Sequence, residues 1–152
     1  MRVRILPSAL VAIVTLIPVF GTGVSPADVK SPDDAAEAAA VPAPIPDNAK
    51  WVNNPHPATP ESIGNGKTIF SSQCTMCHGK SGDGKGDLAV RLGYDLPDFT
   101  SSAAHQSRTD GEYFYILTEG HGKMSGEGDR LGENVRWDLV NYIRSLGPPT
   151  SE

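Results

Sequence analysis

Residues 74–78 read Cys-Thr-Met-Cys-His, and this stretch decides how the rest of the chain is interpreted. The pattern C-x-x-C-H is the attachment signal for a c-type haem. Its two thiols add across the two vinyl groups of the porphyrin, and the histidine that follows becomes the proximal ligand of the iron. At average residue usage, a chain of 152 residues would contain this pattern by chance on the order of once in a thousand. The sequence therefore predicts one haem c, attached covalently through Cys74 and Cys77, with His78 on the iron.

Cys74 and Cys77 are the only two cysteines of the chain, and two other uses remain open for them. A redox-active C-x-x-C opens a helix after a strand within a βαβ pattern, and the sequence before residue 74 contains no such strand pattern. Together with His78 the cysteines could bind zinc, but a structural zinc site takes four ligands from a wider Cys/His constellation. We favour haem attachment over both.

The first 27 residues have the order of an export signal. Arg2 and Arg4 give a positive start, residues 5–20 form an uncharged apolar run, and small residues follow. The run is shorter than the roughly 20 residues of a membrane span, and neither cleavage zone has a clean A-x-A. We expect residues 1–27 to be a signal peptide or an uncleaved signal anchor. The protein would then be periplasmic, either free or held at the inner membrane by residues 5–20.

Composition separates a linker from a folded part. Residues 28–57 are rich in Ala, Pro and acidic residues and predict a disordered linker, because they bury too little apolar surface to offset their ordering entropy. Residues 58–152 then form one small domain, whose core is marginal unless it encloses a large apolar group. Without residues 1–27, 11 basic residues face 18 acidic ones, a formal charge of −7. This balance argues against nucleic acid as a partner.

The folded part is predicted to be all-α, with three main helices over residues 60–72, 110–118 and 133–146. Thr59 and Pro60 suit the start of the first helix, and Thr109 with Glu112 forms a capping-box pattern before the second. The third shows apolar residues at helical spacing. We expect no strand, and we expect residues 79–109 to be a long loop without elements of its own, wrapped around the prosthetic group.

Residues 59–146 resemble the class I cytochrome c family. Gly66 and Phe70 of the first helix and Tyr142 of the last stand where the family crosses these two helices, with a glycine against the facing backbone and aromatics filling the hollow. The resemblance implies a small cytochrome c fold around one covalently bound haem. It also implies an electron-transfer protein rather than an enzyme.

The resemblance also implies the remaining site residues. Pro97, 19 residues after His78, matches a proline whose carbonyl accepts a hydrogen bond from the proximal imidazole. Met124, 46 residues after His78 in a glycine-rich loop, matches the second axial ligand. Relatives often carry proline directly after this methionine, whereas this chain has Ser125. His121 is the competing ligand.

We therefore expect a monomeric periplasmic monohaem cytochrome with His/Met-ligated iron that carries single electrons between redox proteins such as an oxidase, a reductase or a dehydrogenase. Two alternatives remain open. One is a membrane-tethered subunit of a respiratory oxidase or quinoprotein dehydrogenase complex. The other is a haem-based sensor or peroxidase-like protein, in which the distal ligand is labile.

Overall fold

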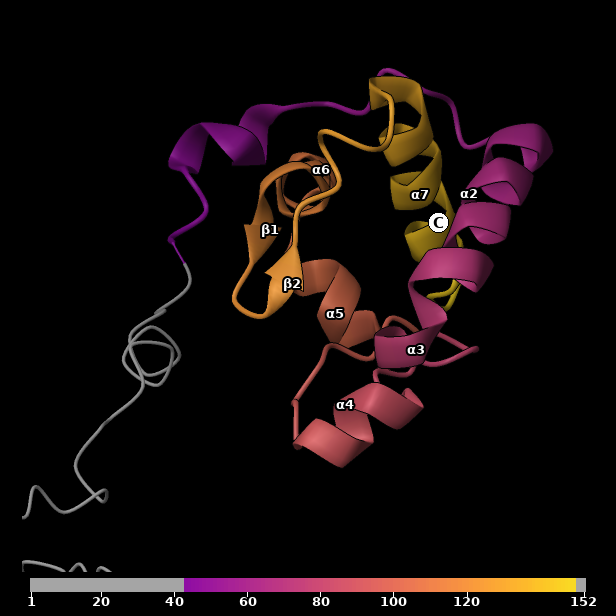
Figure 1. The fold of residues 1–152 in the computed structure, drawn as a ribbon. Coiled ribbons are helices and arrows are strands. Elements are labelled where there is room, and N and C mark those ends of the chain that lie inside the picture. The colour runs from indigo at the N-terminus through magenta and orange to yellow at the C-terminus, as the bar shows by residue number, and fades with distance from the viewer. Residues whose placement is uncertain (1–42, 150–152) are drawn as a thin grey trace, which may run out of the picture. The chain divides into compact units, whose positions relative to one another are not determined.

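The computed structural model describes residues 43–149, which are mostly helical (Figure 1). The expected signal, residues 1–27, and residues 28–42 of the expected linker lie outside the described residues. The elements are η1 (Asp47–Trp51), α2 (Pro60–Gln73), α3 (Thr75–His78), α4 (Asp87–Leu92), α5 (Ser102–Ser107), α6 (Asp110–Glu119), β1 (Gly120–His121), β2 (Met124–Ser125) and α7 (Glu133–Ser145). Within residues 43–149 no helix has the length and apolar character needed to cross a bilayer.

The three expected main helices are confirmed as α2, α6 and α7, and their ends follow the expected capping chemistry. The Thr59 hydroxyl accepts a hydrogen bond from the Ser62 amide, and a proline occupies the first turn of α2. Thr109 and Glu112 form the complete capping box of α6. These caps satisfy amide groups that a helix leaves without internal partners, so the starts of α2 and α6 are set locally.

The prediction of an element-free loop over residues 79–109 is wrong, because this stretch contains α4 and α5. Each spans six residues, which is too short to show a helical apolar period in the sequence. Gly86 is the N-cap that precedes α4, and a Cβ at this position would overlap the backbone of Met76 on α3. Gly93 ends α4 with φ +67, a left-handed conformation that glycine adopts without steric cost.

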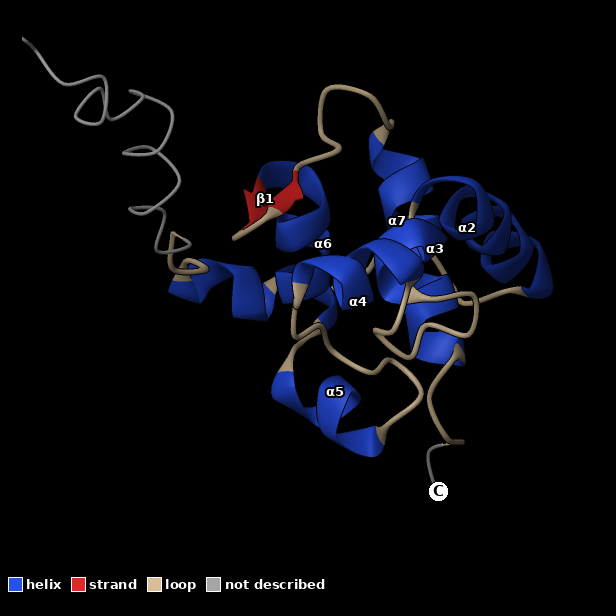
Figure 2. Cartoon of the chain, turned by 60° about the horizontal axis from the view of Figure 1, so that its bottom comes forward, coloured by secondary structure: helices blue, strands red, loops and turns tan. Residues whose placement is uncertain are grey.

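The expectation of no strand is also wrong for four residues. Strands β1 and β2 form an antiparallel hairpin in which Gly120 pairs with Ser125 and His121 pairs with Met124 (Figure 2). Gly122 and Lys123 are left between the strands as a two-residue turn, and Gly122 has φ +60. The hairpin follows α6 directly, so the chain reverses at the end of this helix.

The core centres on the crossing of α2 and α7. A Cβ at Gly66 would overlap the Asp138 carbonyl and approach the Tyr142 Cβ, so only glycine lets the two backbones come this close. The Phe70 and Tyr142 rings pack with centroids 5.2 Å apart. The crossing expected from Gly66, Phe70 and Tyr142 is therefore confirmed. Phe70, Trp137, Leu139 and Val140 are almost fully buried.

Buried polar groups join the segment before α2 to the same crossing. Asn141 donates from Nδ2 to the His56 carbonyl (3.1 Å) and accepts at Oδ1 from Asn54 Nδ2 (2.8 Å). Asp138 accepts from the Ser62 hydroxyl at 2.5 Å. Earlier in the sequence, Ala49 of η1 is also buried. Segment 47–57, which we expected to belong to the linker, thus contacts α6 and α7.

Candidate haem-binding site

A cavity of about 700 Å³ lies between α2–α3, the 93–99 loop, α6, the β-hairpin and α7. All five residues predicted as cofactor-binding line it, and so does His121. Most of the remaining wall is apolar and comes from several elements: Ile69, Phe70, Leu96, Phe99, Ile116, Leu117, Leu131, Leu139 and Ile143. The structure therefore brings the predicted residues together in one largely apolar space. Such a space suits a flat, apolar group.

The Cys-x-x-Cys-His stretch occupies a single turn on the wall formed by α2 and α3. Cys74 is both the last cap of α2 and the first cap of α3. The amides of Cys77 and His78 both donate to the Cys74 carbonyl, at 3.2 and 2.9 Å. This turn directs both cysteine side chains toward one cavity, and both thiols are free. Burial, and next the Glu127 carboxylate, raise the pKa of Cys74 to about 11, so its thiol is protonated at neutral pH.

His78 lies on the same wall and is packed between two aromatic rings. Its ring stacks on Phe99 with centroids 5.2 Å apart and an interplanar angle of 21°, and Phe70 lies 6.3 Å away. Burial lowers the pKa of His78, which favours the neutral imidazole that a metal ligand needs. Its Nδ1 is buried and has no hydrogen-bond partner within residues 43–149.

Pro97 is near His78 but does not accept the expected hydrogen bond from it. Gly84 donates its amide to the His78 carbonyl at 2.9 Å, and a Cβ on Gly84 would lie 3.1 Å from the Pro97 carbonyl oxygen. Both backbones therefore pack against the same glycine. The hydrogen bond between the His78 imidazole and the Pro97 carbonyl therefore stays a prediction.

Met124 reaches the cavity from the β-hairpin, which Figure 1 draws apart from α3. It is partly buried and packs against the core. His121 lies directly opposite it in the ladder. Because side chains of opposed residues in an antiparallel pair project from the same face, both point to one side of the hairpin. The sequence signal for this hairpin was Gly122 at the first position of a two-residue turn, which favours a reversal.

The donor set fits a haem better than it fits a zinc ion. Two free thiols and a neutral imidazole with an unsatisfied nitrogen share one wall, and a thioether side chain stands on another. Within the described part of the chain, no three His, Cys, Asp or Glu side chains gather in a way that could hold a metal ion. The size and apolar lining of the cavity suit a large flat group such as a porphyrin.

Comparisons with known proteins agree with this geometry. The family model described as cytochrome c oxidase, cbb3-type, subunit III matches residues 61–143, more than half of the chain. The chain is 27% identical over 101 residues to the cbb3-type cytochrome c oxidase subunit FixPc of Rhizobium leguminosarum bv. viciae, covering 66% of this chain and 33% of that protein. It thus spans about a third of this relative's length.

Among solved structures, the fold is similar to a chain of the Kuenenia stuttgartiensis reducing HAO-like protein complex Kustc0457/Kustc0458. The TM-score is 0.55 at 28% identity, over 64% of this chain and 50% of the other. The family match runs from α2 to α7, whose side chains line the cavity. The chain therefore belongs to the cbb3-type cytochrome c oxidase subunit III family and carries a class I-type cytochrome c domain, which implies haem c binding.

Proposed function

We propose that this chain is a monohaem c-type cytochrome that transfers single electrons, with Cys74 and Cys77 as the attachment residues and His78 and Met124 as the axial ligands. One observation carries the proposal. A single cavity of about 700 Å³ collects both thiols, the imidazole and the thioether sulfur, each from a different point on its wall. The bound haem would supply a one-electron iron couple, and no enzymatic turnover is required of the protein.

The residues around the cavity suit a carrier rather than a catalyst. His78 and Met124 would both hold the iron, and a substrate would then find no open coordination position. A thioether ligand favours the reduced iron and raises the reduction potential. The aromatic walls exclude water from the haem, and a dry environment favours the oxidation state of the iron that carries less charge. Phe99 and Phe70 hold the imidazole in one orientation, so little rearrangement accompanies gain or loss of an electron.

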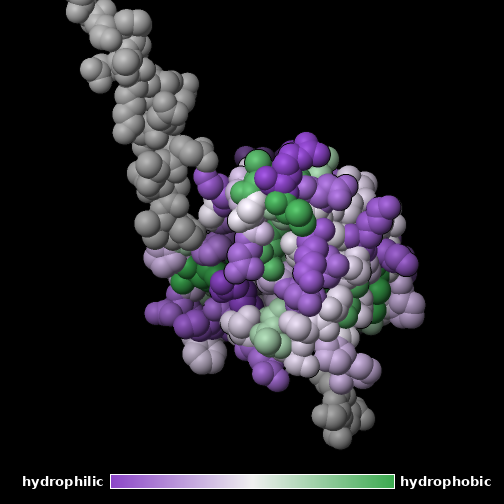
Figure 3. Space-filling model, turned by 90° about the horizontal axis from the view of Figure 1, so that it is seen from below, coloured by the Kyte–Doolittle hydropathy of each residue, from purple (hydrophilic) through white to green (hydrophobic). Residues whose placement is uncertain are grey.

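Electrons would enter and leave at the face formed by α3 and α4. Met76, between the two cysteines, is 65% exposed, and Val90 and Leu92 of α4 are 67% and 50% exposed. In Figure 3, which views the molecule from the side where α4 lies, apolar areas stand among polar ones. Residues 75–95 contain three basic and three acidic side chains, so this face is locally neutral in an acidic protein. Apolar contact next to the attachment turn would let a partner approach the haem edge.

We further propose that the chain acts outside the cytoplasm and docks to redox proteins. Residues 1–27 would be the export signal or an uncleaved anchor, and the segment that follows would be a linker ending near residue 47, where contacts with the domain begin. Homology to a subunit of an oxidase supports a tethered subunit as the second candidate. Membrane fractionation separates the two, because a freely soluble monomeric haem protein contradicts the tether.

A haem sensor or peroxidase-like protein is the third candidate, and it needs a labile distal ligand. The feature that supports it is Ser125, which stands directly after Met124 where relatives often carry proline. Carbon monoxide binding to the ferrous protein at neutral pH decides this point. A reactive iron supports the sensor, whereas an inert iron supports the carrier.

The proposal is tested on the exported protein by intact mass and by oxidised and reduced spectra. We expect the mass of one haem retained after extraction with acidified acetone, and a weak long-wavelength sulfur-to-iron charge-transfer band in the oxidised form. Replacing Cys74 and Cys77 together by serine should abolish haem retention. Pigment that leaves the wild-type polypeptide during extraction contradicts covalent attachment, and a bis-histidine spectrum contradicts Met124.

A further inference from the structure

Arg136 is a buried cation on the first half of α7, away from the predicted ligands. Only 9% of the residue is exposed, and its guanidinium lies over the Phe114 ring with Cζ 5.0 Å from the ring centroid. One nitrogen, Nη1, donates to two backbone carbonyls, Gly128 at 3.0 Å and Leu131 at 2.5 Å. Its Nε is buried and has no hydrogen-bond partner within residues 43–149. The two Nη1 bonds and the contact with the Phe114 ring are therefore the interactions that hold this buried cation in place.

The two carbonyls belong to the segment that continues from Met124 to α7. The same segment is fixed to α6 by backbone hydrogen bonds from Glu127 to Leu117 (2.8 Å) and from Gly128 to Thr118 (3.1 Å). A Cβ at Gly126 would overlap the Thr118 carbonyl, so this contact is at its closest possible approach. Residues 126–131 are therefore held between the end of α6 and the side chain of Arg136.

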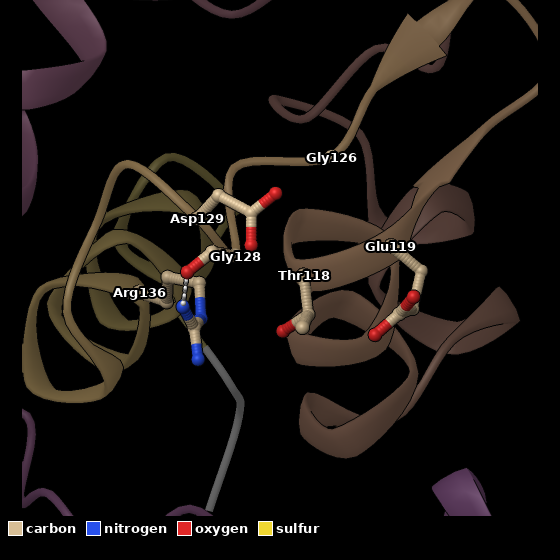
Figure 4. A pocket seen from close by; sticks show the side chains of 6 residues that line it. All are labelled: Thr118, Glu119, Gly126, Gly128, Asp129 and Arg136. Atoms are coloured by element: carbon tan, nitrogen blue, oxygen red, sulfur yellow. Dashed lines mark hydrogen bonds between the residues drawn. The ribbon is translucent and has the colours of Figure 1, made fainter.

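Packing alone does not hold this segment. A second cavity of about 400 Å³ lies beside it, lined by Thr118, Glu119, Gly126, Gly128, Asp129 and Arg136 (Figure 4). The figure shows Arg136 on one side of the loop, bonded to the Gly128 carbonyl, and Thr118 of α6 on the other. Leu131 packs against the hydrophobic core, but open space borders the loop at Gly126 and Gly128, so polar contacts are needed to hold that part of the loop in place. The side chains of Glu119 and Asp129 also line this cavity.

The hairpin that carries Met124 cannot supply the missing rigidity. Each strand has two residues, and an isolated two-stranded hairpin is marginally stable even when it is longer. Ser125 follows Met124 where proline would have stiffened the chain. The position of Met124 therefore depends on the anchors that follow it, at residues 126–131.

We propose that Arg136 is the positioning residue for Met124: by clamping the 126–131 segment to α7, it keeps the thioether sulfur at the iron. This inference rests on the proposed His78/Met124 ligation. It assigns to a side chain outside the cavity the task of keeping the distal ligand from opening. Loss of the clamp would release the loop locally, without unfolding the domain.

Arg144 offers a matched control on the same helix. It also donates to backbone carbonyls, those of His105 (2.9 Å) and Arg108 (2.7 Å), and it lies over an aromatic ring of α6, with Cζ 4.8 Å from the Tyr113 centroid. It also forms an ion pair with Asp110 at the start of α6 (2.6 Å). His105 lies in α5 and Arg108 directly follows it, so none of these partners belongs to the Met124 loop. Arg144→Met should destabilise the domain to a comparable degree while leaving the distal ligand in place.

The experiment compares wild type, Arg136→Met, Arg136→Lys and Arg144→Met as purified haem proteins. The readouts are the temperature dependence of the sulfur-to-iron charge-transfer band, carbon monoxide binding to the ferrous iron, and global unfolding by circular dichroism. In Arg136→Met we expect the band to disappear well below the global midpoint and the carbon monoxide-accessible fraction to rise about tenfold or more. Arg136→Lys, which retains donors and charge, should lie between this variant and wild type.

An Arg136→Met protein whose band persists up to global unfolding, and whose iron is as inert as in wild type, overturns the inference. So does an Arg144→Met protein that loses the band to the same extent. If Arg136→Met does not accumulate, the milder Arg136→Lys decides by the same comparison. A wild type that lacks the band contradicts Met124 ligation itself, so the failure of the proposed function is distinguished from failure of the clamp.

Discussion

Met124 pairs directly with His121 across the two-stranded hairpin, and both side chains line the cavity that also receives His78. The two possible distal ligands are therefore neighbours on one face of the hairpin, one residue beyond each end of its turn. Three positions of separation in the sequence would not by themselves put the two side chains on the same face; the pairing in the hairpin does. This relationship makes the choice of distal ligand a question of chemistry and small displacements, because the fold presents both groups to the same space.

Met124→Ala and His121→Ala should separate these two roles. We expect Met124→Ala to lose the charge-transfer band and to lower the reduction potential by on the order of 100 mV, because a thioether ligand favours the reduced iron. His121→Ala should retain the band and the wild-type potential. Potentiometric titration and visible spectra check both variants. If His121→Ala changes the spectrum and the potential while Met124→Ala keeps the wild-type values of both, the ligand assignment is reversed.

Gly66→Ala should destabilise the domain through the crossing of α2 and α7. The added methyl group would overlap the Asp138 carbonyl, a backbone atom that cannot rotate away, and we expect a loss of about 1–3 kcal/mol or more in the free energy of unfolding. Gly64→Ala is the matched control on α2, because a Cβ there meets no atom within 4 Å.

The control should be neutral or should stabilise α2 by about 0.5–1 kcal/mol, since alanine loses less conformational entropy in a helix interior than glycine does. Guanidinium unfolding of the haem protein measures both changes. Equal effects of the two substitutions would mean that the helices do not cross at Gly66.

Much of the fold could be predicted from single residues whose physical role is local. Thr59, Thr109 and Glu112 mark helix starts by hydrogen bonds within one turn, and these caps are present. Gly66, Phe70 and Tyr142 mark the crossing, because a close backbone approach and an aromatic pair need those residue types. The C-x-x-C-H stretch likewise forms one turn in which a local pattern sets the spacing of its side chains.

The features that escaped prediction depend on tertiary contacts. Helices α4 and α5 are too short for a periodic signal and owe their place to contacts such as Gly86 against the α3 backbone. The hairpin at His121 and Met124 has only two residues per strand, below the length at which alternation can be recognised. The role of residues 47–57 was missed because Asn54 and Asn141 pair over 87 positions of sequence, and no local pattern announces such a contact.

Tyr113→Phe should show a stability difference that depends on pH. The Tyr113 hydroxyl donates to the Ala104 carbonyl at 2.9 Å, and burial raises the pKa of this phenol, although Arg144 partly opposes the shift. At neutral pH we expect the free energy of unfolding of the variant to be about 1 kcal/mol lower than that of wild type, which is the typical net contribution of one hydrogen bond. A raised pKa in the folded state means that the contribution of Tyr113 is complete below the ordinary phenol value of about 10 and is lost as the pH rises through the folded value.

Phenylalanine does not ionise. The difference in free energy of unfolding between wild type and Tyr113→Phe should therefore be smaller at about pH 11 than at neutral pH. Urea unfolding at the two pH values measures the change, with Tyr115→Phe as the control because Tyr115 lies on the same helix and is less buried. If the stability difference between wild type and Tyr113→Phe stays constant with pH, or grows toward alkaline pH, burial does not raise the pKa of Tyr113.

The docking role of the α3–α4 face can be tested without a known partner, because oxidised and reduced copies of the protein exchange electrons with each other. Val90→Glu places a charge on this face and makes the two copies repel at the contact, so the self-exchange rate should fall at low salt and recover as salt screens the repulsion. Val52→Glu adds the same charge at another exposed valine, which follows η1 and does not belong to α3 or α4. Line broadening of haem-methyl resonances in mixtures of the two redox states measures the rate. Because both variants have the same net charge, a decrease confined to Val90→Glu identifies the face through which electrons pass, whereas equal decreases would show that net charge alone controls the encounter and that the α3–α4 face has no special part in it.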